Sequence, residues 1–186
     1  MKKIYLGILT ILLMLGLSGC AGAGYNLAPS SQKEVTKDIT IKYDKFKKQT
    51  WIETPSYLLR DGFTDRFPVV ASYRTLQKDN ELKFIQLYLK ISGTEWAFFN
   101  NAVGEDGYTF KFLEIDSDVN VISGGGQAMA IVREHVALSI TMEQLKKIAL
   151  KNYEIKIYGK RREGSFTMPK IITAAFLSKI SQLEVK

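Results

Sequence analysis

From residue 38 onward, apolar and polar residues alternate with a period of two, which is typical of β-strands with one buried face. The pattern is clearest from Ile85 to Ile91, where four aliphatic residues share one face of the segment. Turn-forming pairs such as Asp79-Asn80 and Asp106-Gly107 separate successive segments. We therefore expect an irregular connection over 55–68 and strands over 39–43, 50–52, 69–76, 82–92, 95–101, 108–115, 133–141, 153–159 and 166–168.

Two later segments follow the helical period instead. Thr141-Met142-Glu143-Gln144 fits a capping box, in which Thr141 caps the helix and the side chain of Gln144 reaches back. Pro169 suits the first position of a closing helix. The apolar stripes of these helices are Met142, Leu145, Ile148 and Ala149, and then Ile172, Phe176, Ile180 and Leu183.

Consecutive strands accompanied by helices favour the α+β class over a regular alternation of strands and helices. We expect an antiparallel β-sheet, arranged as a meander, with two helices packed on one face. The aromatic row of Tyr108, Phe110 and Phe112 lies on one face of its strand, and we expect it to belong to the core.

The N-terminal segment has a different pattern. Lys2 and Lys3 precede an apolar stretch over 4–17. This stretch is shorter than the roughly 20 residues that a membrane-spanning helix needs, but it suits the hydrophobic region of a signal peptide. It ends in Leu17-Ser18-Gly19-Cys20, two small residues followed by the only cysteine of the chain.

This tetrapeptide resembles the lipobox of bacterial lipoproteins. The resemblance implies that signal peptidase II cleaves before Cys20, that the thiol of Cys20 carries a diacylglycerol group, and that the freed amine is a site for a further acyl chain such as palmitate. Ala21 stands where an Asp would signal retention in the inner membrane. The resemblance therefore implies the outer membrane in a Gram-negative source. The alternative is an ordinary signal peptide with a cysteine at this position by chance.

These patterns divide the chain into a lipoprotein signal peptide over 1–19, a flexible tether over 20–37 and a single α+β domain over 38–186. Gly22, Gly24 and Pro29 give the tether its flexible composition. The sequence of the domain itself identifies no family. With Cys20 as the only cysteine, it can form no internal disulfide and no thiolate metal site.

The net charge of +7 falls to +5 once Lys2 and Lys3 leave with the signal peptide. This modest positive charge favours anionic partners such as lipid or acidic cell-wall polymers. No basic block interleaved with aromatic residues stands out, so we expect no nucleic-acid partner. Lys160-Arg161-Arg162 is either a solvated loop or a contact for lipid head groups or an acidic partner.

Two loop-like segments resemble ligand sites only in part. Asp116-Ser117-Asp118-Val119-Asn120 begins like a calcium loop, but Val121 and Gln127 stand where such a loop needs glycine and glutamate. We therefore expect an acidic loop between strands. Gly124-Gly125-Gly126 lacks the Gly-Lys-Ser/Thr ending of a phosphate-binding loop, and we expect a flexible loop.

His135 is the only histidine, and the strand alternation places it on the face opposite to Val136 and Leu138. With no second histidine and no cysteine in the domain, familiar zinc sites cannot form. No serine lies in a Gly-x-Ser-x-Gly turn. We expect no catalytic residue, no cofactor and no metal; a pair of carboxylates is the one remaining route to catalysis.

The sequence thus predicts a membrane-anchored envelope lipoprotein with a non-catalytic binding or adaptor role. Its expected partners are the membrane, through the lipid on Cys20, and an envelope protein. Two alternatives remain open: a hydrolase of cell-envelope glycans that uses paired carboxylates, and a carrier of a small apolar ligand.

Overall fold

The computed structural model describes residues 25–60, 68–79, 81–124 and 127–184, so the expected signal peptide and Cys20 lie outside the described residues. The fold belongs to the α+β class and is built mostly of antiparallel strands. Its elements are α2 (Gln32–Asp38), β1 (Thr40–Asp44), β2 (Gln49–Glu53), β3 (Tyr57–Arg60), β4 (Val69–Lys78), β5 (Glu81–Gly93), β6 (Phe99–Gly104), β7 (Lys111–Gly124), β8 (Gln127–Ser139), α3 (Met142–Ile148), β9 (Tyr153–Gly159), β10 (Glu163–Met168) and α4 (Lys170–Glu184).

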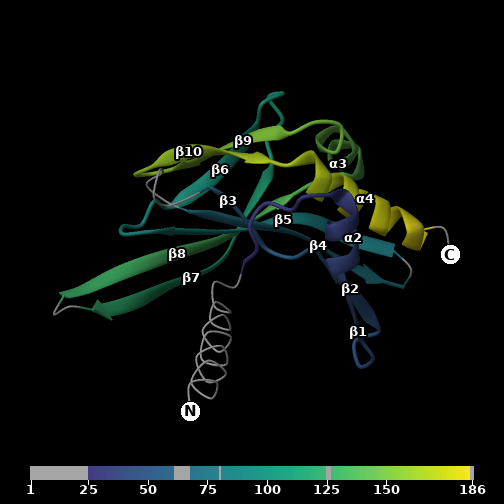
Figure 1. Cartoon of the computed structure of the whole chain (residues 1–186), viewed down its shortest axis with the longest axis horizontal. Helices are drawn as coiled ribbons and strands as arrows, with labels where there is room; N and C mark the ends of the chain where they lie inside the picture. The colour runs from purple at the N-terminus through teal and green to yellow at the C-terminus, as the bar shows by residue number, and fades with distance from the viewer. Residues whose placement is uncertain (1–24, 61–67, 80, 125–126, 185–186) are drawn as a thin grey trace, which may run out of the picture.

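The strands form two sheets rather than one meander (Figure 1). Within the described residues, the larger sheet has the order β1-β2-β4-β5-β8-β7, with β3 paired to β4 beside this path. The smaller sheet has the order β10-β9-β6. The expected single meander is therefore wrong, because β8 lies between β5 and β7 and because β6 pairs with β9. The alternation of residues fixes which face of a strand is buried, but it does not fix the neighbour of that strand.

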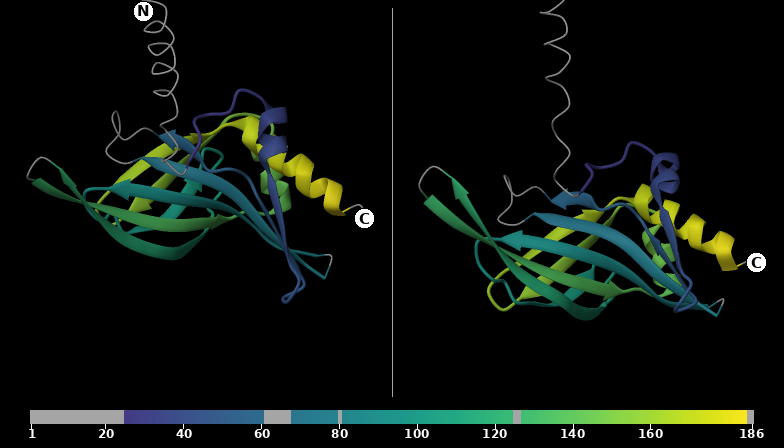
Figure 2. Two further views of the ribbon diagram at one scale, coloured as in Figure 1. Left: turned by 60° about the horizontal axis from the view of Figure 1, so that its bottom comes forward. Right: turned by 90° about the horizontal axis from the view of Figure 1, so that it is seen from below.

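Strands β7 and β8 are longer than expected and pair as far as Gly124 and Gln127. The expected acidic loop is therefore wrong, because residues 116–120 lie inside β7. Of the three glycines of the expected flexible loop, Gly124 ends β7, and the other two lie outside the described residues. The hairpin extends away from α4 and beyond the rest of the described fold (Figure 2).

The structure differs from the expected tether over its second half. The side-chain oxygen of Ser31 accepts a bond from the backbone N–H of Glu34 at 3.3 Å and caps α2. Val35 of this helix is fully buried, and the backbone N–H of Asn26 donates to the carbonyl of Ser56 at 2.7 Å. A helix this short is stabilised by such packing rather than by its own propensity, so the domain begins before residue 38.

The core contains residues from both sheets and all three helices of the described chain. Tyr73 of β4 stacks on Phe176 of α4, with ring centroids 5.1 Å apart, and its hydroxyl lies 3.0 Å from Oγ1 of Thr173. Phe110 is only 3% exposed, with Tyr108 and Phe112 packed against the core, which confirms the core role of the aromatic row. Burial of each large apolar side chain contributes about 1.5–3 kcal/mol to stability.

Three further points bear on the expected elements. The segment expected to be irregular over 55–68 contains β3, and the strand expected over 95–101 begins only at Phe99. Lys170 is the first residue of α4, so Pro169 precedes the helix and its carbonyl accepts from Ile172 at 3.1 Å.

Among the described helices, none has the length and apolar character needed to cross a bilayer.

Candidate functional site

A pocket of about 510 Å³ lies where the larger sheet meets the start of the smaller one. Strands β7 and β8 contribute one side, and the segment leading into β6 contributes another. The turn after β9 completes the lining. The residues that line the pocket are Trp96, Phe98, Phe99, Asn100, Glu114, Ile115, Asp116, Ser117, Glu134, His135, Val136 and Lys160.

Glu134 of β8 fixes the segment that precedes β6. Its Oε1 accepts from the backbone N–H groups of Ala97 at 2.6 Å and Phe98 at 3.2 Å, and its Oε2 accepts from the N–H of Phe99 at 2.9 Å. Hydrogen bonds to a carboxylate are stronger than those between neutral groups. One side chain of the larger sheet therefore orients three successive amides at the start of β6, a strand of the smaller sheet.

The same segment is held from its other side by the smaller sheet. The backbone N–H groups of Lys160 and Arg161 donate to the carbonyls of Phe98 at 3.2 Å and Ala97 at 3.1 Å. A Cβ atom added to Gly159 would lie 2.5 Å from the carbonyl oxygen of Ala97. This close approach of two backbones explains why a glycine ends β9.

These contacts stabilise an unusual backbone conformation at Phe98. Its φ of 56° lies in the left-handed region, which costs free energy for a residue with a bulky side chain. The ring is 44% exposed, lies 6.4 Å from the ring of Trp96, and has the guanidinium of Arg161 5.3 Å from its centroid. The strained backbone thus presents a pair of aromatic rings at the pocket.

A β-bulge in β7 decides which polar side chains face the aromatic pair. Glu114 pairs with Val136 and Asp116 pairs with His135, and the register shifts between them. Since Val136 and His135 are consecutive, Glu114 and Asp116 lie on opposite faces of the sheet, although residues two positions apart in a regular strand share a face.

The register therefore separates two groups of carboxylates. Glu114 shares its face with Glu134, and Ser117 pairs with Glu134. The carboxylate of Glu134 already binds three amides. Asp116, which also lines the pocket, accepts from the N–H of Ser117 at 2.8 Å, so Glu114 is the lining carboxylate without a hydrogen bond among the described residues. This arrangement does not favour the two facing carboxylates of a glycan hydrolase.

His135 belongs to a polar row on the opposite face. Its Nδ1 lies 2.6 Å from the hydroxyl of Tyr88, and its Nε2 lies 3.2 Å from Oδ2 of Asp118 without the geometry of a hydrogen bond. Asp118 also pairs with Arg133 at 3.2 Å. Burial raises the pKa of Tyr88, with Arg74 opposing and nearby acidic groups adding to the effect, so its phenol stays protonated and is a poor nucleophile.

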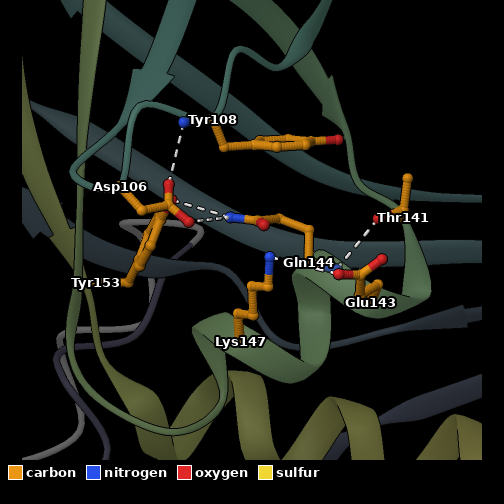
Figure 3. Close-up of polar contacts among 7 residues, drawn as sticks. All are labelled: Asp106, Tyr108, Thr141, Glu143, Gln144, Lys147 and Tyr153. Carbon is orange, nitrogen blue, oxygen red and sulfur yellow. Dashed lines mark hydrogen bonds and ion pairs between the residues drawn. The ribbon is translucent and has the colours of Figure 1, made fainter.

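A second polar cluster joins the turn after β6 to α3 and β9 (Figure 3). The hydroxyl of Tyr153 donates to Oδ1 of Asp106, and the amide Nε2 of Gln144 donates to the hydroxyl of Tyr153 at 2.9 Å. The bond from Tyr153 holds the pKa of Asp106 below its usual value, while burial and Asp106 raise the pKa of Tyr153. A Cβ atom on Gly104 would lie 1.9 Å from the Tyr153 hydroxyl, so the glycine makes room for it. Each group in the cluster has a partner, which is typical of a structural role.

The same cluster determines whether the expected capping box forms at the start of α3. Oγ1 of Thr141 accepts from the N–H of Gln144 at 3.1 Å, so the predicted N-cap is confirmed. The side chain of Gln144, however, points to Asp106 and Tyr153, and no return bond to Thr141 is formed within the described chain. The expected second half of the capping box is therefore wrong, because Tyr153 of β9 and Asp106 of the turn after β6 bind the amide.

The remaining sequence candidates are placed as follows. In Lys160-Arg161-Arg162, Lys160 lines the pocket, Arg161 lies over the ring of Phe98, and Arg162 pairs with Glu95 at 3.1 Å. Cys20 lies outside the described residues. Over the described ranges, no three His, Cys, Asp or Glu side chains gather in a group that could hold a metal ion.

Sequence reasoning did not identify Trp96, Phe98 and Glu134 as members of a site. A weak signal was present, since two aromatic residues flank a single alanine directly before a strand. Comparison with models of protein families, with curated proteins and with solved structures finds no match to this chain.

Proposed function

We propose that this chain is a membrane-anchored lipoprotein of the bacterial envelope, held by lipid on Cys20, and that its domain has a non-catalytic binding role. The basic start, the apolar stretch and the Leu17-Ser18-Gly19-Cys20 motif support the anchor. The absence of Asp at position 21 supports the outer membrane if the source is Gram-negative. The pocket beside Glu134 supports the binding role.

We infer that the ligand of this pocket is a saccharide. The observation that carries the inference is the fixed aromatic pair, Trp96 and Phe98, beside short polar side chains. The C–H face of a pyranose ring is apolar and packs flat on an aromatic ring, while its hydroxyl groups bind carboxylates and amides. The lining combines these aromatic rings with polar groups that can set the orientation of a ligand, as is typical of ligand sites.

The charges of the pocket support a neutral polyhydroxyl ligand over an anionic one. The lining carries three carboxylates, those of Glu114, Asp116 and Glu134, against the single ammonium of Lys160, so an anionic ligand would meet like charges. For a cationic ligand, the cation–π position over Phe98 is already filled by Arg161. The same charged groups do not favour the alternative of an apolar carrier, whose cavity would be closed and apolar.

The test is the binding of glycan fragments by the full-length protein in detergent. We expect saturation-transfer NMR to show contact with neutral oligosaccharides of N-acetylglucosamine, and we expect Trp96→Ala to abolish it. Trp51→Ala is the matched control, because Trp51 packs against Phe84 and does not line the pocket. Equal contact in wild type and Trp96→Ala, or none in either, would contradict the saccharide site. Release of shortened glycan by the wild type would favour the hydrolase instead.

A second candidate, an adaptor for an envelope protein, is supported by the outer part of the β7–β8 hairpin. We call residues 119–122 and 128–131 the outer ribbon. Val119, Val121, Ile122 and Met129 of this ribbon are each at least half exposed. Exposed apolar side chains gathered on one projecting element are typical of a protein interface.

The adaptor predicts a discrete partner in the cell. We expect a photo-crosslinking residue at Val121 to capture one envelope protein in the wild type and to lose it in Cys20→Ala, because the anchor holds the protein in the membrane that contains its partner. A crosslinker at Leu150, which is equally apolar and 80% exposed, is the control. The adaptor role is wrong if position 121 captures no more than position 150 does.

We also infer that α3 and α4 pack on one face of the β-structure, as the sequence predicts. The stacking of Tyr73 on Phe176 and the contact of α3 with α4 support this arrangement. It leaves the pocket clear of both helices, since no residue of α3 or α4 lines it.

A further inference from the structure

The β1–β2 hairpin has a defined turn at its tip. Oδ1 of Asp44 accepts from the backbone N–H of Phe46 at 2.9 Å and from that of Lys47 at 3.1 Å. Lys48 closes the turn with a φ of 49°. Strand β1 is the edge of the larger sheet, and the hairpin extends past the neighbouring strands (Figures 1 and 2).

Four lysines surround this tip. Lys42, Lys45, Lys47 and Lys48 lie within seven residues and all four are exposed. Within the described chain, none of them forms an ion pair with a carboxylate, and Asp44 is occupied by the two amides of the turn. The tip therefore carries a net positive charge, because four ammonium groups stand against the single carboxylate of Asp44.

Three apolar side chains stand among these lysines. Phe46 is 87% exposed at the apex, Tyr43 is 66% exposed and Ile41 is 45% exposed. Nζ of Lys45 lies 5.1 Å from the ring centroid of Phe46, so the ring and the charge occupy the same apex. Exposed apolar side chains that gather on one element, as these three do, are typical of an interaction site.

We propose that the β1–β2 hairpin docks on the surface of an anionic lipid bilayer. Lysines attract the negative surface, and an aromatic ring and aliphatic side chains enter the interfacial layer between head groups. The convex apex suits a bilayer, because lipid head groups rearrange around an inserted ring. A nucleic acid would instead need a groove that follows its backbone, with the rings on the floor of the groove.

This proposal does not rest on the saccharide pocket or on the lipid of Cys20. The hairpin lies on the edge of the larger sheet opposite to β7, and none of its residues lines the pocket. If the chain is anchored through Cys20, the hairpin adds a second contact that sets the orientation of the domain on the membrane.

The test uses the full-length protein reconstituted in vesicles, with an environment-sensitive nitrobenzoxadiazole label on Phe46→Cys. The control carries the label on Leu150→Cys, because Leu150 is 80% exposed and distant from the hairpin in the sequence. Cys20 is present in both proteins, and labelled wild type supplies its background signal. Vesicles of phosphatidylcholine alone are compared with vesicles that contain phosphatidylglycerol.

We expect the emission of the label at position 46 to shift to the blue, and to be quenched by spin-labelled lipid, only in vesicles with phosphatidylglycerol. Salt at about 0.5 M should reverse the shift, because it screens the lysines. The label at position 150 should keep its aqueous emission. The combined change Lys45→Gln, Lys47→Gln and Lys48→Gln should weaken the contact by at least about tenfold.

An aqueous emission at position 46 in both kinds of vesicle would overturn the proposal. A shift of the same size in neutral vesicles would also overturn it, because the lysines would then play no part in recognition. The altered side chains are exposed, so the variants should retain the fold, which circular dichroism checks. Loss of the anchor would instead appear as labelling of Cys20 in the wild type, and so is distinguishable from failure of the docking.

Discussion

At the scale of single residues, Glu134 has the largest influence on the candidate site, because its carboxylate accepts from three successive amides across two sheets. We expect Glu134→Ala to lower the free energy of unfolding by about 3 kcal/mol, since it leaves these amides without their acceptor. Thermal unfolding followed by circular dichroism measures the change.

Glu114→Ala is the control for this prediction. Glu114 lines the same pocket, but it forms no hydrogen bond or ion pair within the described residues, and we expect its loss to change stability by less than about 0.5 kcal/mol. Equal effects of the two substitutions would show that Glu134 does not hold the segment before β6.

The phenol of Tyr57 should make the folded protein less stable at alkaline pH. Burial, with the charges of Asp38 and Glu34, raises the pKa of Tyr57 to about 12 from an ordinary value of 10. The folded state therefore favours the protonated phenol, so this contribution is fully present below pH 10 and is lost as the pH rises from 10 to about 12. We expect Tyr57→Phe to unfold at a higher pH than the wild type, in an alkaline titration followed by circular dichroism. Coincident titrations would refute the assignment.

Local chemistry predicted the Thr141 cap, because a cap depends on residues three positions apart. It could not predict the Glu134 contacts, since the bonded amides lie 35 to 37 positions away. Nor could it predict the left-handed backbone at Phe98, where glycine would be the usual residue. The surface of the β1–β2 hairpin was missed for a different reason. Its lysines and aromatic residues alternate over 41–48, but this short run was not recognised as a basic block that contains aromatic residues.

At the scale of elements, β7 and β8 divide into an inner part within the sheet and the outer ribbon. The last pair between β8 and β5 is Val132 with Gly93, so beyond this point β8 pairs only with β7. A hairpin of two strands alone is marginally stable in water. We expect amides of the outer ribbon to exchange with deuterium at least about a hundredfold faster than amides of β5, as measured by mass spectrometry.

The inner part of β8 provides the comparison within the same strand. Residues 133–138 pair with β5 on one side and β7 on the other, and we expect them to exchange as slowly as β5 does. Equal rates along the whole of β8 would mean that the outer ribbon is covered, which would itself indicate a partner.

Most strands and both C-terminal helices could be predicted from periodicity, because that pattern depends on burial alone. Helix α2 could not, since its seven residues contribute one fully buried side chain, Val35. Residues 116–120 of β7 could not either, because acidic residues at alternate positions of an exposed strand have the composition of a loop. The pocket could not be predicted, because it depends on the bulge between Glu114 and Asp116. The bulge moves the following side chains to the other face of the sheet, and no turn residue marks it in the sequence.

At the scale of the whole molecule, the proposed anchor predicts a defined mature N-terminus. We expect mass spectrometry of the protein from its membrane fraction to find a chain that begins at Cys20 and carries diacylglycerol. Cys20→Ala should leave the signal peptide uncleaved and the mass without lipid. A lipid-free chain that begins at another residue would indicate an ordinary signal peptide.

The strand order also governs the behaviour of the chain during synthesis and export. Strand β8 completes the larger sheet between β5 and β7, and β9 joins β6 to β10 in the smaller one. A chain that emerges from its N-terminus can therefore complete the larger sheet only when residue 139 has appeared, and the smaller sheet only when residue 168 has appeared. In the meantime the aliphatic face of β5 is exposed and prone to aggregation. The nascent protein should depend on a holding chaperone until its last third has been translated.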